Sequence, residues 1–307
     1  MTTPISTTPI STTLTATTRG TTADSAAVQG AVHGPVLAAG HGRVTFAGTA
    51  ASEWIKFRTL RSTVWTLVAV VVLLVVTSVL AAWGSSVELV EAGSSTGMDI
   101  AQLLSAGYQL AQLAVAVLGV LIITGEYSTG MVRTTFAAVP RRVPVLWAKA
   151  LVLTGAVLLV SLVSAGISYV ATLPFHDELG ATLDLSRAET LRMTVGLPLY
   201  LAAIGLLAFA VGALVRHSAG ALTAVIALLL VVENVLMMVP LGAVEQISPF
   251  LPSTAGRRVL FDSEMITAVD AATAGAHLAP WQGYAVLLAW VAALLALAAV
   301  RLRRRDA

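Results

Sequence analysis

Six long apolar runs occupy most of the chain beyond residue 60, and the charged residues collect between them. The runs lie at residues 64–83, 100–125, 150–175, 193–215, 218–239 and 281–300. A helix rises 1.5 Å per residue, so about 20 residues cross an apolar bilayer core of about 30 Å. Each run meets that requirement. The pattern therefore predicts an all-α integral membrane protein with six transmembrane helices.

The positions of the basic residues predict the orientation of these helices. If the N-terminus is cytoplasmic, only four of the 18 lysines and arginines fall in outer segments: Arg187, Arg192, Arg257 and Arg258. Cytoplasmic loops of membrane proteins are enriched in Lys and Arg. We therefore expect both chain ends on the cytoplasmic side, with most acidic residues outside.

The two ends of the chain differ from the apolar region in composition. Residues 1–50 are rich in Thr, with Ser, Pro and Gly, and have no apolar block. Such a segment buries too little surface to offset its ordering entropy, and it lacks the layout of a secretory signal peptide. We expect a disordered cytoplasmic tail at 1–50, a six-helix domain at 51–302 and a basic cytoplasmic C-terminus at 303–307.

The stretch SEWIKFRTLRSTVW, residues 52–65, precedes the first run. Phe57, Leu60 and Val64 recur at helical spacing, which predicts an amphipathic helix lying in the membrane interface. Its interfacial residues would be Trp54, Lys56, Phe57, Arg58 and Arg61. The helix is either a plain anchor or an elbow whose tilt follows motion of the transmembrane helices.

A second polar stretch, GEYSTGMVRTTFAAVPRRVPVLWAK at residues 125–149, separates the second and third runs. Val132, Phe136 and Val139 predict a short helix over residues 126–139 with one apolar face. Pro140 ends it, because the residue before a proline disfavours α geometry. From these residues alone the segment is a connecting helix held by lipid headgroups.

The order of these features resembles the membrane subunits of ABC-2 type transporters, a family of ATP-binding-cassette exporters. The first cytoplasmic loop of that family carries a helix of pattern E-x-x-x-G-[TM]-x-R-x-T, then Pro, basic residues and Lys. The matching residues are Glu126, Gly130, Met131, Arg133, Thr135, Pro140, Arg141 and Lys149, with Met131 replacing the more usual Thr. The outer segment ISPFLPSTAGRRVL is similar to the family's P-x-x-AG region. The resemblance covers about residues 52–302.

The resemblance implies a permease subunit in a bacterial plasma (inner) membrane. Residues 126–139 would be a coupling helix that docks on a separate ATPase, which would bind and hydrolyse Mg-ATP. The coupling residues would be Glu126, Tyr127, Gly130, Arg133 and Phe136. The resemblance also implies a second permease subunit, expected to be a copy of this chain. Re-entrant outer helices at residues 249–274 would cover Glu233 and form an extracellular gate.

The composition excludes several other chemistries. There is no cysteine, and neither lysine, Lys56 nor Lys149, follows a glycine-rich loop, so the chain has no P-loop of its own. The sequence GSSTG at residues 93–97 lacks the strand-to-helix context of a nucleophile elbow. No histidine spacing indicates a metal site. We expect no enzymatic activity, no bound cofactor and no nucleic-acid partner.

Polar residues inside the apolar runs mark either helix packing or a pathway. Gln102, Gln109 and Gln112 fall with Ser105 on one face of the second run. Such residues usually join helices, but the stripe is also a candidate substrate path or dimer face.

Glu233, followed by Asn234, interrupts the fifth run about 25 Å beyond Arg216 at helical rise, which predicts the outer leaflet. It is either a functional ionisable group or a carboxylate that is solvated or supported by Asn234. Two other functions stay open: a carrier or channel that is not driven by ATP, and a membrane scaffold. A carrier would be expected to show internal repeats and ionisable groups near the midplane, and neither is evident.

Overall fold

The computed structural model describes residues 45–92, 99–128, 142–238, 242–273 and 275–303. These residues are helices and short connections, with one isolated bridge between Asp99 and Thr182. The compact unit begins at Val44, and its first helix, α1 (Phe46–Thr59), starts inside the expected tail. Residues 46–50 therefore belong to α1. The predicted disorder of the tail lies outside the described residues.

All six predicted runs form helices that are long and apolar enough to cross a membrane. Single helices form five of these spans: α2 (Arg61–Ala92), α4 (Tyr108–Ser128), α6 (Arg142–Leu179), α7 (Ala188–Val215) and α13 (Pro280–Arg303). The fifth span along the chain is a continuous run of α8 (Ser218–Ile226), the π-helix η1 (Ala227–Val232) and α9 (Glu233–Met238). The described residues thus indicate an all-α, multi-pass membrane protein.

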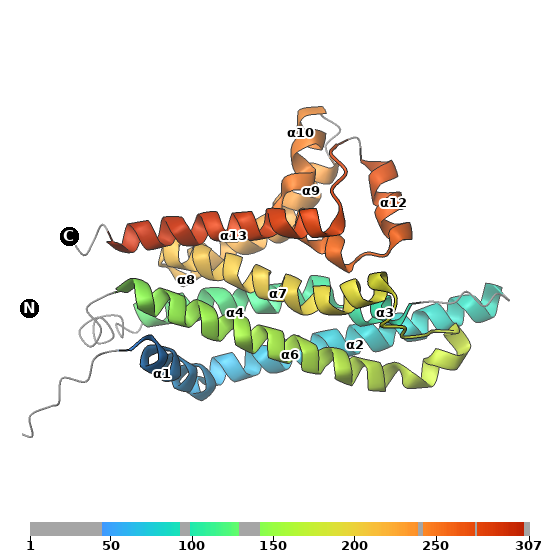
Figure 1. Ribbon diagram of the computed structural model, residues 1–307, viewed down its shortest axis with the longest axis horizontal. Helices are drawn as coiled ribbons and strands as arrows, with labels where there is room; N and C mark the ends of the chain where they lie inside the picture. Colours follow the sequence, from blue (N-terminus) through green and yellow to red (C-terminus); the bar gives the residue numbers. More distant parts are fainter. Residues whose placement is uncertain (1–44, 93–98, 129–141, 239–241, 274, 304–307) are drawn as a thin grey trace, which may run out of the picture. The chain divides into compact units, whose positions relative to one another are not determined.

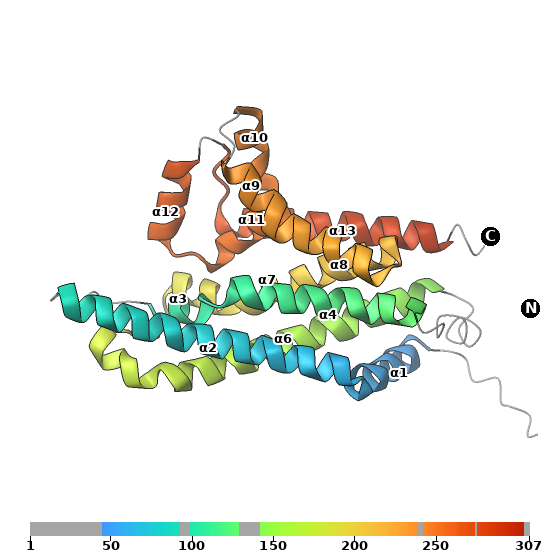
Figure 2. The same cartoon turned by 180° about the vertical axis from the view of Figure 1, so that it is seen from behind.

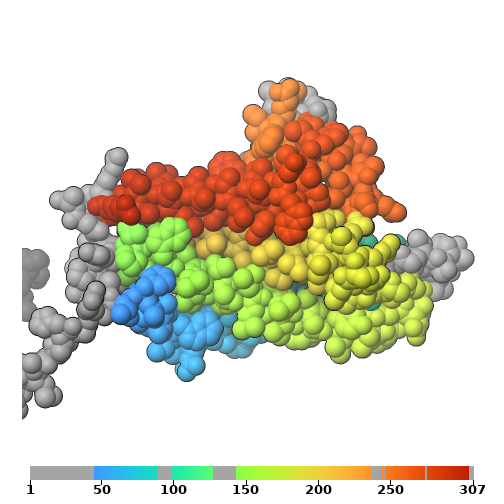
Figure 3. Space-filling model, in the orientation of Figure 1, coloured from blue at the N-terminus to red at the C-terminus, as the bar shows by residue number. Residues whose placement is uncertain are grey.

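Helix α7 is the central helix of the bundle. Of the 18 most apolar consecutive residues of α7, 72% are buried, whereas the corresponding share in α2 is 17%. Helix α7 is therefore surrounded by protein, and α2 lies at the rim. The large side chains Tyr200 and Phe209 of α7 are fully buried. Figures 1 and 2 show α7 between α13 on one side and α4 and α6 on the other. In the space-filling view, α13, α7 and α6 follow one another across one face (Figure 3).

Two glycines bring α4 and α7 into close contact. A Cβ atom built on Gly119 would lie 2.3 Å from the carbonyl oxygen of Gly205. Small residues at such crossings let helix backbones approach in membrane proteins. The close contact places α4 directly against the central helix.

The second run is two helices rather than one. The short helix α3 (Ile100–Ser105) ends before Ala106 and Gly107, and α4 begins at Tyr108. A Cβ atom on Gly107 would lie 2.1 Å from the Thr77 hydroxyl, so the turn packs tightly against α2. The break shifts the expected polar stripe: Gln102 lies on α3, whereas Gln109 and Gln112 lie on α4.

The stretch expected to form one interfacial helix is also divided. Leu60 is extended (φ −75°, ψ 117°), which ends α1, and α2 starts at Arg61. Phe57 therefore lies on α1 and Val64 on α2, and Leu60 and Val64 are each 46% exposed, as an apolar face toward lipid would be. The face of α1 that is buried against the protein is made of Thr49, Glu53 and Phe57.

The segment between α9 and α13 folds back against the bundle. It contains α10 (Gly242–Ile247), the 3-10 turn η2 (Ser248–Phe250), α11 (Pro252–Gly256), the 3-10 turn η3 (Arg257–Leu260) and α12 (Ser263–Ala272). Figures 1 and 2 show α9, α10 and α12 projecting to one side of α13.

The short helix α11 is buried throughout and packs tightly on α13. A Cβ atom on Gly283 of α13 would lie 2.3 Å from the carbonyl oxygen of Ala255, and one on Gly256 would lie 2.5 Å from Leu287. This contact accounts for the small residues of the STAG sequence. Arg258 then fixes the following turn by donating to Asp270 and to the Leu278 carbonyl, each at 2.6 Å.

Candidate functional site

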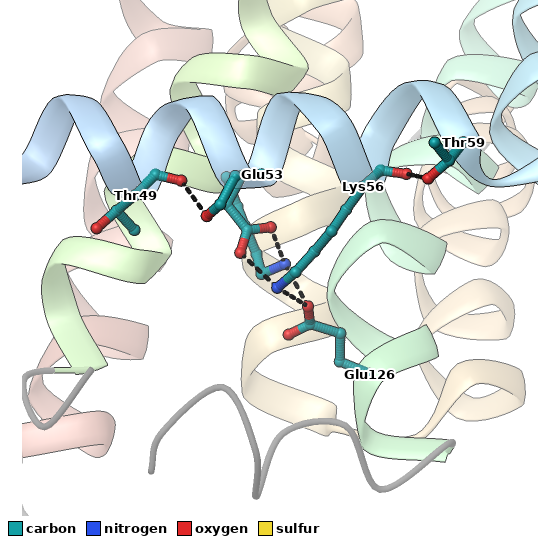
Figure 4. Close-up of polar contacts among 7 residues, drawn as sticks. Thr49, Glu53, Lys56, Thr59 and Glu126 are labelled. Carbon is teal, nitrogen blue, oxygen red and sulfur yellow. Dashed lines mark hydrogen bonds and ion pairs between the residues drawn. The ribbon is translucent and has the colours of Figure 1, made fainter. Parts of the chain in front are cut away.

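Four charged side chains from three helices meet at the end of the bundle that carries α1. Glu53 and Lys56 project from α1 toward Glu126 of α4 (Figure 4). The Lys149 ammonium, on α6, lies 2.5 Å from Glu53 Oε2 and 2.7 Å from Glu126 Oε1. The Lys56 ammonium lies 2.9 Å from Glu53 Oε1 and 3.3 Å from Glu126 Oε1. We call these four residues the ion-pair cluster.

The ion-pair cluster is largely withdrawn from solvent and carries no net charge. Glu53, Glu126 and Lys149 are buried, while the Lys56 side chain keeps 34% of its surface exposed. Burial on its own lowers the pKa of Lys56, but hydrogen bonds and Coulomb attraction from Glu53 and Glu126 together raise it above its usual value. Each carboxylate faces two ammonium groups, and Lys56 stays charged at neutral pH.

The location of the ion-pair cluster determines which parts of the chain it links. Glu126 lies at the end of α4 and Lys149 lies in the second turn of α6, so the cluster spans the two ends of the 129–141 segment. Glu53 and Lys56 connect both ends to α1. The expectation that a separate helix begins at Glu126 is corrected, because residues 126–128 complete α4. Glu126 contacts Lys56 and Lys149 of its own chain, and it lies near the end of α4 and not at the start of a docking helix.

The remaining residues predicted for these segments are placed as follows. Tyr127 lies in the last turn of α4, and Gly130, Arg133 and Phe136 lie outside the described residues. On α1 and α2, Trp54 stacks on Phe57 with ring centroids 5.9 Å apart, and Arg58 and Arg61 are exposed.

A second polar group lies inside the bundle, where α4, α7 and α11 meet. The Tyr200 hydroxyl donates to Gln112 Oε1 at 2.5 Å and lies 2.9 Å from Ser253 Oγ. All three side chains are buried. The group satisfies the polar atoms that the apolar interior would otherwise leave without partners. Sequence reasoning found Gln112 and missed its two partners.

Glu233 is held by the same short helix, α11. Its carboxylate accepts from the Ser253 backbone N–H at 2.8 Å and from the Thr254 hydroxyl at 2.9 Å, and only 3% of the residue is exposed. The reading of a solvated or Asn234-supported carboxylate is therefore wrong, since Asn234 turns away and donates to the Leu230 carbonyl. Glu233 joins the fifth membrane helix to the segment that folds back behind it.

Four of the five residues proposed for a pathway or dimer face line one cavity of about 190 Å³: Gln109, Gln112, Glu233 and Asn234. Ser253 and Arg257 complete its polar wall. Gln102 lies elsewhere, in a cavity of about 180 Å³ beside Tyr108 and Met265. The structure thus brings α4, α9 and α11 together around one polar space.

Two features of the sequence point to the ion-pair cluster. Lys56 and Lys149 are the only lysines of the chain, and acids are scarce in the segments that were predicted to be cytoplasmic. Glu53 could not be singled out from the sequence, because its buried partner Lys149 lies 96 residues later in the chain. Among the described residues, no three His, Cys, Asp or Glu side chains are grouped as metal ligands. The sequence matches no protein-family model and no curated protein.

Proposed function

We propose that the chain is the permease subunit of an ABC-2 type exporter, with both ends cytoplasmic. The observation that carries this proposal is the ion-pair cluster, which joins α1 to both ends of the 129–141 segment. In the proposal that segment contacts a separate ATPase, which binds and hydrolyses Mg-ATP. The chain itself supplies the membrane helices and the mechanical link.

The cluster supports the proposal because it makes three helix ends move together. Removing one partner of a buried ion pair costs about 3–5 kcal/mol, so Lys149, Glu53 and Glu126 resist separation. A displacement of the 129–141 segment would therefore shift the ends of α4 and α6 with α1. That is the behaviour expected of an elbow helix rather than of a plain anchor.

A second copy of the chain completes the proposal. Gln109 and Asn234 are exposed although they lie within membrane-crossing helices. In the fifth membrane helix, residues 218–236, only 22% of the 18 most apolar consecutive residues are buried. Amide side chains in a bilayer favour a protein partner over lipid, because lipid offers no hydrogen bonds. The surface formed by α4 and the fifth membrane helix would then be the dimer face.

A cross-linking experiment tests the ATPase contact, and the absence of cysteine simplifies it. Ser128→Cys places a single thiol at the last residue of α4, and Ser186→Cys places one between α6 and α7 at the other end of the bundle. Each variant is labelled with a photo-reactive maleimide in native membranes, and captured proteins are identified by mass spectrometry. We expect Ser128→Cys, and not Ser186→Cys, to capture a P-loop ATPase. Capture of lipid alone by a labelled, intact Ser128→Cys chain would overturn the proposal.

The buried carboxylate of Glu233 is the observation that favours the alternative, a carrier not driven by ATP. Its two donors from α11 give it a structural partner, which makes a transport role unnecessary. Transport that continues in ATP-depleted vesicles and is lost in Glu233→Gln would favour the carrier.

A further inference from the structure

A cavity of about 310 Å³ lies beside the ion-pair cluster, between α1, the start of α2, α4 and α6. Most of its wall is hydrocarbon, contributed by Phe57, Leu60, Leu118, Leu121, Ile122 and Val152. Phe57 and Leu118 are buried, whereas Leu60, at the end of α1, is 46% exposed.

The remaining wall is polar and charged. The Ser62 and Thr66 side chains of the first turns of α2 line it, as does the ion-pair cluster. A space that is apolar in one part and polar in another matches a molecule with a hydrocarbon chain and a polar head. The lining therefore predicts an amphiphile rather than a wholly polar or wholly apolar ligand.

The charge that a ligand can reach near this cavity is positive. Glu53 and Glu126 are buried and already paired with lysines. Lys56 keeps a third of its side chain exposed, and the neighbouring Arg58 and Arg61 are exposed. The head group that complements this end of the cavity is therefore an anion.

The cavity also lies at the right depth for a membrane lipid. Arg61 is the first residue of a helix long and apolar enough to cross the membrane, so Leu60 and Ser62 lie where head groups meet acyl chains. Long basic side chains at this depth reach outward to phosphate while their stems stay in hydrocarbon. A soluble anion would not need the aliphatic wall.

We propose that this cavity binds one anionic glycerophospholipid, with an acyl chain against Leu118 and Ile122 and the phosphate near Lys56 and Arg61. The lipid's phosphate shares the Lys56 ammonium with Glu53 and Glu126, so its binding reaches the ion-pair cluster. The inference rests on the membrane location of the chain and not on the proposed ATPase partner.

The test is a lipid-retention experiment on the full chain. The protein is purified in mild detergent, equilibrated with equal amounts of dioleoyl-phosphatidylglycerol and dioleoyl-phosphatidylcholine, and examined by native mass spectrometry. Thr66→Phe fills the cavity from α2. Val68→Phe is the matched control, because Val68 is 44% exposed on the same helix and does not line the cavity.

We expect the wild-type chain to retain one phosphatidylglycerol with a preference of about tenfold over phosphatidylcholine. Thr66→Phe should lose that lipid, and Val68→Phe should keep it. The double variant Arg58→Gln, Arg61→Gln should reduce the head-group preference without changing the cavity. Excess inorganic phosphate should not displace the lipid.

Equal retention by wild type and Thr66→Phe, or equal retention of the two lipids by wild type, would overturn the proposal. Displacement by inorganic phosphate would assign the site to a soluble anion instead. If Thr66→Phe is not monodisperse in size-exclusion chromatography, Ile122→Phe fills the cavity from α4. The arginine variants test the head group independently of both.

Discussion

The ammonium of Lys149 lies 2.5 Å from a carboxylate oxygen of Glu53, a residue 96 positions earlier in the chain. Through this pair the start of α6 is tied to the helix that precedes the first membrane span. Both side chains are about 95% withdrawn from solvent, with 5% and 4% of their surfaces exposed. The pair is therefore screened little by water and salt.

Lys149→Met should destabilise the protein by about 3 kcal/mol, because two buried carboxylates would lose the lysine that lies nearer to both of them. Thermal unfolding of the detergent-solubilised protein measures this. Lys56→Met is the control and should cost clearly less, since its side chain is 34% exposed. The double variant Glu53→Gln, Lys149→Met should cost less than the sum of the single changes. Equal melting temperatures for wild type and Lys149→Met would contradict the prediction.

Gly119→Ala should also be destabilising, because the added methyl group would meet the Gly205 carbonyl oxygen at 2.3 Å and force α4 away from α7. We expect a cost of about 1–3 kcal/mol from this overpacking. Gly155→Ala is the matched control on α6, where an added Cβ has nothing within 4 Å. It should be neutral or stabilising by up to about 1 kcal/mol, through helix propensity. The same thermal unfolding measurement distinguishes the two, and equal effects would exclude close packing as the cause.

The six membrane helices could be predicted from the sequence because each apolar run is long enough on its own. Their arrangement could not, since the runs of α2 and α7 have similar hydropathy but very different burial. What makes α7 central is contact between distant residues, such as Gly119 with Gly205. Hydropathy along the chain does not report such contacts.

For the polar sites too, single residues could be recognised from the sequence but their partners could not. Lys56, Glu126 and Glu233 could be singled out as charges beside or inside apolar runs. Their partners could not, because Glu53 and Ser253 are identified only when α1 and α11 fold back on the membrane helices. The extended backbone of Leu60, which ends α1 before α2 begins, also could not be predicted from the sequence.

The pH dependence of stability should reveal the charge state of Lys56. Its pKa is raised above the unfolded value of 10.5, so its contribution is fully present below that pH and is lost as pH rises through the folded pKa. The difference in melting temperature between wild type and Lys56→Met should therefore stay constant from about pH 6 to about pH 9 and shrink only above 10.5. A difference that already falls between about pH 7 and about pH 9 would show that Lys56 is not held as a cation.

Glu233→Ala should loosen α11 rather than the whole bundle. The change removes the acceptors of the Ser253 N–H and the Thr254 hydroxyl, both in buried positions, and each unmade bond costs about 1–3 kcal/mol. Hydrogen–deuterium exchange should therefore rise in peptides covering residues 248–260 while α4 and α7 stay protected. Asn234→Ala is the control at the next position, because that side chain is exposed and donates to the Leu230 carbonyl in the preceding turn of the same membrane-crossing run.

Glu233→Gln refines the same prediction. Glutamine keeps one acceptor oxygen and the shape of the side chain, so exchange over residues 248–260 should fall between wild type and Glu233→Ala. If Glu233→Ala and Asn234→Ala exchange alike, the carboxylate does not hold α11. Residues 248–260 would then be held by other contacts, such as those of Ala255 and Gly256 with α13 and of Ser253 with Tyr200.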